Sequence, residues 1–302
     1  MSDSAASISS PTLAREREAI RHALVALCER SLDGVIARIA DAIRYSLLGE
    51  GKRMRGTLLM SAFEAAGGVG DAADLAASIE VVHAYSLVHD DLPCMDDDDV
   101  RRGRPTVHRV YGVPTATAAG LAMVPLAARC AADAARGLGL ADATIAIIVV
   151  ELMRASGAGG MIGGQLLDLE GEATALGLAD LEQIHRAKTG ALISAAATIG
   201  GRAARTTPAR LAALGAYGAA VGLAFQIADD VLDVTATTDQ LGKTAGRDLA
   251  LQKSTYPALL GVDGARHRAE ALIRDGCEAL DAEGMLTPAL ANIARFTVER
   301  TS

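Results

Sequence analysis

Two clusters of aspartates, each embedded in an apolar helical run, limit what this chain can fold into more than any other feature. The first is "HDDLPCMDDDDV" at residues 89–100, and the second is "FQIADDVLDV" at residues 225–234. An acidic run is most often a solvated surface or a disordered tail, but apolar segments flank both clusters. Carboxylates crowded into an apolar setting must be protonated or neutralised by a cation. The sequence therefore predicts that the two clusters share one cation-filled cavity.

The second cluster has the spacing of a single helix face. Asp229 and Asp233 are four residues apart, and Gln226 precedes Asp229 by three residues. Residues at these spacings lie above one another on an α-helix. Because the preceding residues are apolar, we expect the face that carries these three side chains to look inward.

The first cluster cannot lie on one face of an ideal helix. Asp90 and Asp96 are six residues apart, which places them about 240° apart around the helix axis. Pro93 lies between them and removes an interior helix hydrogen bond. We therefore predict a local distortion that brings Asp96 round beside Asp90.

Helical patterns dominate the rest of the chain. Of its 302 residues, half are hydrophobic, 3% are aromatic and none is Trp, a composition that favours closely packed helices over a β-sandwich. Apolar residues recur at spacings of three and four, with Gly-rich breaks between the segments. Only residues 144–150, "TIAIIVV", are strand-like, and a buried helix is equally consistent. We predict an all-α, single-domain bundle of about ten or more helices around a central cavity, formed by residues 13–302 after a flexible tail at 1–12.

Charge and composition argue against several classes of protein. The net charge of −8 leaves no basic stripe for nucleic acid. Four widely spaced cysteines fit the reduced thiols of a cytoplasmic protein, and the N-terminus lacks the basic and apolar regions of a secretory signal. The longest uncharged stretch, residues 211–228, is weakly hydrophobic. We interpret it as a buried core helix and predict no membrane span.

Basic residues accompany the acidic clusters near Gly-rich turns. Arg101 and Arg102 follow the first cluster directly. Two further basic groups lie in "GEGKRMRG" and "GKTAGRDLALQKSTYP", namely Lys52, Arg53 and Arg55, and Lys243, Arg247 and Lys253. Carboxylate sites suit Mg²⁺, which commonly binds substrate phosphates as well, and guanidinium groups match phosphate oxygens. Together these residues predict a site for a phosphate compound bound with Mg²⁺.

Six motifs occur in one order along the chain: "GKRMR", "HAYSLVHDDLPCMDDDDVRRGRPTVH", "GGQLLDL", "AKTGALI", "FQIADDVLD" and "GKTAGRDLALQKSTYP". In this order they resemble the trans-isoprenyl diphosphate synthases, or polyprenyl synthetases, and among these the bacterial farnesyl and geranylgeranyl diphosphate synthases. The resemblance implies an all-α homodimer that joins isopentenyl diphosphate head to tail to an allylic diphosphate, either dimethylallyl or geranyl. It also implies about three Mg²⁺ ions per active site, with Mn²⁺ as an alternative.

The resemblance also implies roles for residues at matching positions. The metal ligands would be Asp90, Asp91, Asp96, Asp229, Asp230 and Asp233. Isopentenyl diphosphate would be bound by Lys52, Arg55, His83 and Arg102, and the allylic diphosphate by Arg101, Lys188, Lys243 and Lys253. Thr189 and Gln226 would lie beside the carbocation that forms when the allylic C–O bond ionises. The catalytic residues would therefore be Asp90, Asp96, Asp229, Lys188, Thr189 and Gln226.

Product length depends on the residue that closes the cavity below the first cluster. Tyr85 lies five residues before Asp90, or about 7.5 Å along a helix, where a ring could stop the growing chain, and Ser86 beside it leaves some room. The bacterial farnesyl synthases of the family are similar, with an aromatic residue there and an insertion corresponding to Pro93 and Cys94. We favour farnesyl diphosphate as the product, with geranylgeranyl diphosphate as the alternative.

Several residues depart from the family's pattern, among them Glu50, where the family usually has a second Gly, and Arg104, where it usually has Lys. Gly56 stands where the family usually has Pro, Leu121 stands where it commonly has Asp, and Pro125 would interrupt a helix.

Two other functions stay open. A class I terpene cyclase also uses an aspartate motif and Mg²⁺, but cyclases line their cavities with aromatic residues, which are scarce here. A non-catalytic regulatory subunit would usually have lost one aspartate motif, and both are intact.

Overall fold

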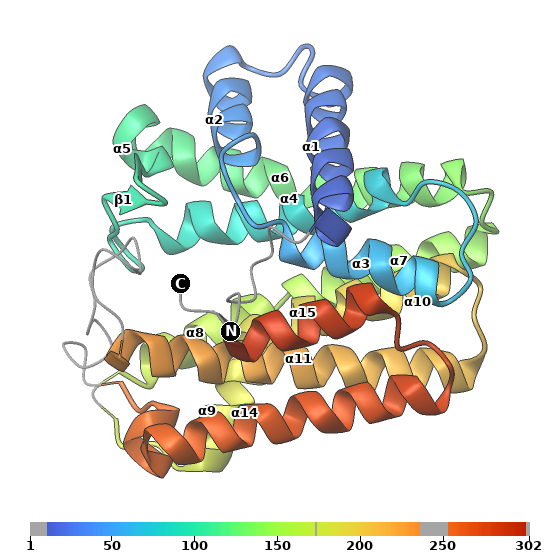
Figure 1. Cartoon of the computed structure of the whole chain (residues 1–302). Helices are drawn as coiled ribbons and strands as arrows, with labels where there is room; N and C mark the ends of the chain where they lie inside the picture. The colour runs from blue at the N-terminus through green and yellow to red at the C-terminus, as the bar shows by residue number, and fades with distance from the viewer. Residues whose placement is uncertain (1–10, 173, 236–252, 300–302) are drawn as a thin grey trace.

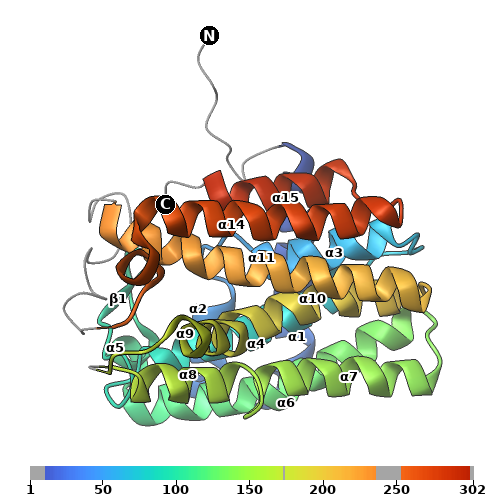
Figure 2. The same ribbon diagram turned by 90° about the horizontal axis from the view of Figure 1, so that it is seen from below.

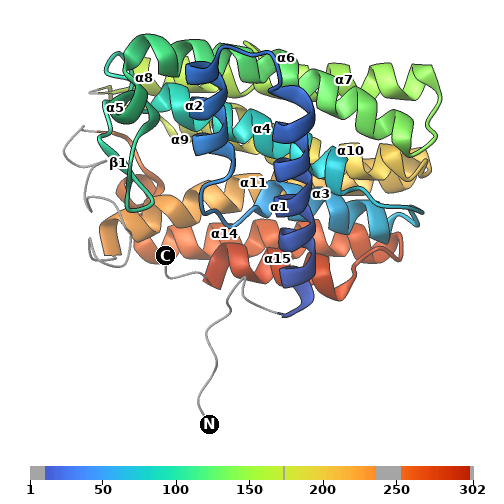
Figure 3. The ribbon, with the colours of Figure 1, turned by 90° about the horizontal axis from the view of Figure 1, so that it is seen from above.

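The two helices that carry the aspartate clusters are buried along most of their length. The structure, a computed structural model, describes residues 11–172, 174–235 and 253–299 (Figure 1). Helix α4 spans Ala73–Asp90 and helix α11 spans Pro208–Thr235. Both segments are largely apolar around their circumference, as is typical of helices inside a protein. The C-terminal ends of α4 and α11, where the aspartates occur, lie at the same end of the bundle (Figures 1 and 3).

The other helices surround this pair. They are α1 (Pro11–Ser31), α2 (Ala37–Leu47), α3 (Met54–Ala65), α5 (Val107–Tyr111), α6 (Val113–Gly137), α7 (Asp142–Ser156), α8 (Met161–Glu170), α9 (Leu178–His185), α10 (Ala191–Ala203), α14 (Tyr256–Ala282) and α15 (Pro288–Glu299). Helix α4 packs against α6, while α11 packs against α10 and α14. Helices α1 and α2 run across the long helices (Figures 1 and 3). The prediction of an all-α fold is confirmed, and the strand-like residues 144–150 belong to α7.

A two-stranded hairpin follows the first aspartate cluster. Strand β1 (Val100–Arg101) pairs antiparallel with β2 (Arg104–Pro105). The two residues between them, Arg102 and Gly103, both have positive φ values, 52° and 71°, as in the tight turns that match the twist of paired strands. The side chain of Tyr45 on α2 supports the hairpin, because its hydroxyl donates to the carbonyl of Pro105 at 2.8 Å.

One turn of π-helix, η1 (Arg186–Gly190), joins α9 to α10 and contains Lys188 and Thr189. Such turns insert an extra residue into a helix and occur frequently at functional sites. Helices α8, α9, α10 and α11 all contact η1. The π-turn therefore holds Lys188 and Thr189 where several core helices meet.

Helix α6 continues without a break through Pro125, so the expectation that this residue would interrupt a helix was wrong. Proline removes one hydrogen bond, to the carbonyl group four residues earlier. That carbonyl belongs to Leu121, whose side chain is 61% exposed, and Pro125 is itself exposed. The lost bond therefore falls on a side of α6 that does not pack against the rest of the chain.

Three helical segments have the length and mean hydropathy of a membrane span: residues 113–137, 142–170 and 208–235. Inside the structure, 50%, 39% and 56% of their most apolar windows are buried. The absence of a membrane span therefore stays a prediction.

Residues 1–10 lie outside the described part of the chain, and α1 begins at Pro11, so the boundary expected after residue 12 falls in the first turn of this helix.

Candidate active site

The chain folds back at the first aspartate cluster, as its spacing predicts. Helix α4 ends at Asp90, and the backbone N–H of Asp96 donates to the carbonyl of Asp90 at 2.8 Å. A second turn is closed by the N–H of Met95, which donates to Leu92 at 2.8 Å. The distortion around Pro93 thus returns Asp96 to the end of α4.

The first two carboxyl groups of this cluster, those of Asp90 and Asp91, are held in an environment that disfavours their charge. Burial raises the pKa of Asp90 to about 6; the Lys188 ammonium group lowers this pKa, and the neighbouring Asp96 carboxylate raises it. Burial also raises the pKa of Asp91, although Arg101 lowers it. Carboxylates that are crowded and partly desolvated gain most from a bound cation. The donor set therefore fits an oxygen-binding divalent ion such as Mg²⁺.

The two arginines of the hairpin, Arg101 and Arg102, bind different partners. The Nε atom of Arg101 donates to the Asp91 carboxylate at 2.6 Å. Arg102 instead donates from Nη1 to the carbonyl of Glu50 at 2.8 Å. The basic motif around Lys52 is therefore held beside the first aspartate cluster.

The basic motif at residues 51–56 is anchored on α4. Arg55 approaches the Nε2 atom of His83 at 3.2 Å. Burial lowers the pKa of Arg55, while the carboxylates of Glu80 and Asp229 raise it. Arg55 is thus influenced by the second aspartate cluster as well as by α4. The ammonium group of Lys52 lies 5.4 Å from the centre of the Phe296 ring.

Glu80 is a functional candidate that the sequence analysis missed. It is 2% exposed, accepts a hydrogen bond from the N–H of Gly56 at 2.9 Å and lies 3.6 Å from Arg53. A buried glutamate in the apolar segment before His83 was the available signal. This contact also explains Gly56, because a proline at that position would have no N–H to donate.

The second aspartate cluster is connected to the π-turn through side-chain hydrogen bonds. Thr189 donates to the Oε1 atom of Gln226 at 3.0 Å, and the amide of Gln226 donates to Asp230 at 3.1 Å. Asp230 is 3% exposed and also accepts from the backbone N–H of Tyr256 at 3.1 Å. Both oxygens of Asp230 therefore already hold hydrogen bonds that brace Gln226 and the start of α14.

Asp233 and Asp229 occupy the end of α11 with different exposure. Asp233 is 5% exposed, whereas Asp229 is partly exposed. His185, which the sequence analysis also missed, lies 3.6 Å from Asp230 and stacks on Tyr256. Motif spacing gave no signal for His185, because it approaches α11 from α9.

Two predicted substrate-binding lysines meet at one carboxylate. The ammonium groups of Lys188 and Lys253 donate to the same oxygen atom of Asp168, at 2.6 Å and 2.8 Å. Although burial acts to raise it, these two lysines lower the pKa of Asp168 to about 2. Lys243 lies outside the described residues.

The two residues predicted to set product length are both buried on α4. Tyr85 is 4% exposed, and its ring meets the His89 ring edge-on with centroids 5.3 Å apart. Burial and the Asp90 carboxylate raise the pKa of Tyr85 to about 12. Ser86 donates its hydroxyl to the carbonyl of His83 at 2.9 Å, so its polar atom is satisfied within the helix.

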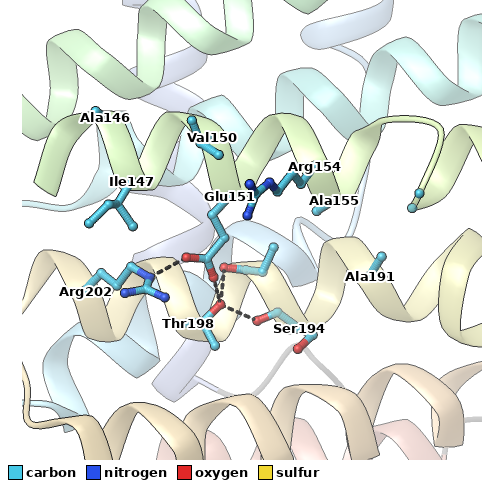
Figure 4. A pocket seen from close by; sticks show the side chains of 13 residues that line it. Ala146, Ile147, Val150, Glu151, Arg154, Ala155, Ala191, Ser194, Thr198 and Arg202 are labelled. Atoms are coloured by element: carbon cyan, nitrogen blue, oxygen red, sulfur yellow. Dashed lines mark hydrogen bonds and ion pairs between the residues drawn. The ribbon is translucent and has the colours of Figure 1, made fainter. Parts of the chain in front are cut away.

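Two further features are a group of possible metal ligands and a pocket between two helices. Asp97 and Asp99 of the first cluster, together with His108, each bring one potential ligand atom to within 4.8 Å of the others, and these three residues are outside the predicted ligand set. A pocket of about 710 Å³ lies between α7 and α10, where Glu151 accepts hydrogen bonds from Thr198 and Arg202 (Figure 4). Its lining contains none of the predicted site residues.

Comparison with known proteins agrees with the arrangement of these motifs. A chain named geranylgeranyl pyrophosphate synthase 9, chloroplastic, from Arabidopsis thaliana is 45% identical over 246 residues, which cover 80% of this chain and 68% of the relative. Farnesyl diphosphate synthase from Escherichia coli is 44% identical over 267 residues, covering 87% and 89%. A solved geranyltransferase from Helicobacter pylori, complexed with magnesium and isoprenyl diphosphate, superimposes with a TM-score of 0.77 at 32% identity, covering 95% and 96%. Residues 36–284 match the sequence pattern of the family described as polyprenyl synthetase. The chain therefore belongs to the polyprenyl synthetase family and is a prenyltransferase.

Proposed function

We propose that this enzyme condenses isopentenyl diphosphate with dimethylallyl and then geranyl diphosphate, head to tail, and releases farnesyl diphosphate. The observation that carries this proposal is the meeting of acidic and basic groups at one end of the bundle. Lys188 lowers the pKa of Asp90 on α4, and its neighbour Thr189 is hydrogen-bonded to Gln226 on α11. Such a site can bind a diphosphate together with cations and a carbocation.

The two aspartate clusters would hold the metal ions. Asp90, Asp91 and Asp96 would serve on the first side, and Asp229 with support from Asp230 and Asp233 on the second. Mg²⁺ bound there supplies positive charge that stabilises the diphosphate as it leaves the allylic carbon. We propose about three ions per site, with Mn²⁺ as an alternative.

The basic residues divide between the two substrates in this proposal. Arg101, Lys188, Lys243 and Lys253 bind the allylic diphosphate, and Lys52, Arg55, Arg102 and His83 bind isopentenyl diphosphate. Arg101 keeps its fixed position through Asp91, at 2.6 Å. Arg55 lies against His83 at 3.2 Å, so these two groups can contact the same phosphate.

Thr189 and Gln226 act on the carbon that becomes positive. The hydrogen bond between them is 3.0 Å long, and Asp230 fixes the other end of the Gln226 amide at 3.1 Å. Oxygen dipoles held in advance stabilise a developing positive charge without further reorganisation. The diphosphate that leaves is then the base that accepts the final proton.

The residue below the first aspartate cluster sets the length of the product in this proposal. Tyr85 is buried and favours farnesyl diphosphate in this proposal, because an aromatic ring below Asp90 would stop a growing chain. Geranylgeranyl diphosphate is the second candidate, and the similarity to a relative named as a synthase of this product supports it, with 45% identity.

A second copy of the chain is the proposed partner, in the cytoplasm. The described parts of α6, α7 and α8 expose several large apolar side chains, namely Leu121, Ile147, Val150, Ile162, Leu166 and Leu167. Helices α6 and α7 lie side by side (Figure 2). An exposed apolar surface of this kind is typical of a protein interface, so we propose that it is the dimer contact.

Incubation of the pure enzyme with Mg²⁺, isopentenyl diphosphate and each allylic diphosphate tests the proposal. We expect farnesyl diphosphate as the main product by mass spectrometry, and no turnover after EDTA is added. A hydrocarbon formed from one allylic substrate alone would indicate a cyclase instead. Activity that appears only with a second, different chain would indicate a regulatory subunit.

A further inference from the structure

We infer that Asp168 is a positioning residue whose carboxylate holds the ammonium groups of Lys188 and Lys253 side by side for the diphosphate of the allylic substrate. This inference rests on the proposed function, in which both lysines bind that diphosphate. It adds a residue that acts through the two lysines and does not itself contact the substrate.

The geometry of the contact is specific. Both lysines donate to the same Oδ2 atom of Asp168, Lys188 at 2.6 Å and Lys253 at 2.8 Å. Two ammonium groups this close repel each other unless a negative charge lies between them. Asp168 provides that charge, so the lysines are gathered before any substrate arrives.

Three elements have to meet for this contact to form. Asp168 lies on α8, Lys188 in η1, and Lys253 just before Thr255, the residue that caps α14. Gly164 lies one turn before Asp168 on the same face of α8. A Cβ atom at Gly164 would lie 2.1 Å from the backbone nitrogen of Lys188. The glycine therefore lets α8 come close enough for the short aspartate side chain to reach Lys188.

Burial and charge both favour a fixed arrangement. The side chains of Asp168 and Lys253 are only 16% and 15% exposed, and that of Lys188 is 26% exposed. The ammonium of Lys188 also lowers the pKa of Asp90, so the charge of this lysine acts on the first aspartate cluster as well as on Asp168. Removing one partner of a hydrogen-bonded ion pair that is largely buried leaves the others without compensation.

Glu172 provides a matched control in the same surroundings. Its carboxylate lies 3.3 Å from Lys253, and among the described ion pairs it has none with Lys188. Loss of its charge should disturb one lysine, whereas loss of the Asp168 charge should release both.

The test compares Asp168→Asn with Glu172→Gln in the full-length enzyme. We expect Asp168→Asn to raise KM for geranyl diphosphate about tenfold, in line with the loss of charged hydrogen bonds, and to leave KM for isopentenyl diphosphate within about twofold. Glu172→Gln should give a smaller increase. In a Lys188→Met, Lys253→Met background, Asp168→Asn should add no further increase, because Asp168 has then lost the groups through which it acts.

Equal increases in both KM values, or an unchanged KM for geranyl diphosphate, would overturn the inference. If Asp168→Asn does not fold, the test uses Asp168→Glu, which keeps the negative charge but displaces it by one methylene group. An unchanged KM for geranyl diphosphate in Asp168→Glu would also overturn the inference. Calorimetric binding of pyrophosphate with Mg²⁺ separates the two proposals. Binding weakened by Asp168→Asn in a protein that forms no prenyl product would contradict the proposed function and support the inference.

Discussion

Tyr85 is the side chain that limits the product chain in the proposed mechanism. It is 4% exposed, and its ring packs edge-on against His89. We predict that Tyr85→Ala opens the space below Asp90, so that geranylgeranyl diphosphate replaces farnesyl diphosphate as the main product by mass spectrometry. Tyr85→Phe keeps the ring and should leave the product unchanged. An unaltered product profile in Tyr85→Ala would refute the role of this residue.

His83 should make the stability of the enzyme depend on pH. Its Nε2 atom faces Arg55 at 3.2 Å, and because a guanidinium only donates, that nitrogen must be unprotonated. Burial and then Arg55 lower the pKa of His83 well below 6.5. The folded state therefore binds a proton at His83 more weakly than the unfolded state does. As a consequence, the free energy of unfolding falls as the pH drops below the pKa of His83 in the unfolded state.

The wild-type enzyme should therefore lose up to about 1.4 kcal/mol more stability per pH unit below about pH 6.5 than His83→Gln. Urea unfolding of both proteins at several pH values measures this difference. Parallel stability profiles would show that His83 does not titrate in the way its environment indicates.

One contact between α4 and α6 places the His89 ring directly against Gly120. A Cβ atom at Gly120 would lie 2.2 Å from the Nε2 atom of His89, which also contacts the carbonyl of Thr117 at 3.2 Å. We predict that Gly120→Ala displaces His89 and lowers the free energy of unfolding by about 1–3 kcal/mol. Gly137→Ala on the same helix meets no atom within 4 Å and serves as the control. Equal stabilities of the two variants in urea unfolding would contradict the prediction.

The assembly of the whole molecule depends on the apolar surface of α6, α7 and α8 in our proposal. Val150 on α7 is 46% exposed and Ile147 is 47% exposed. We predict that Val150→Arg converts the dimer into a monomer, because an arginine would be buried there without a partner. Light scattering after size-exclusion chromatography measures the mass. Val69→Arg, at a residue 90% exposed in the loop between α3 and α4, should remain dimeric, and an unchanged mass for Val150→Arg would locate the interface elsewhere.

Local spacing was enough to predict much of this molecule. The fold class followed from helical periodicity and composition, and the return of Asp96 to Asp90 followed from the six-residue spacing and Pro93. Each of these rests on residues a few positions apart, whose relation the backbone geometry determines. The order of the motifs was enough to predict the family.

Tertiary structure alone decided which groups these residues meet. Asp168 holds Lys188 and Lys253 although they are 20 and 85 residues away in the chain, and Glu80 meets Gly56 across 24 residues. Partners at such distances are selected by the packing of whole helices, which no short spacing records. The continuation of α6 through Pro125 has the same origin, because the cost of a lost backbone bond depends on whether that side of the helix packs against the rest of the chain.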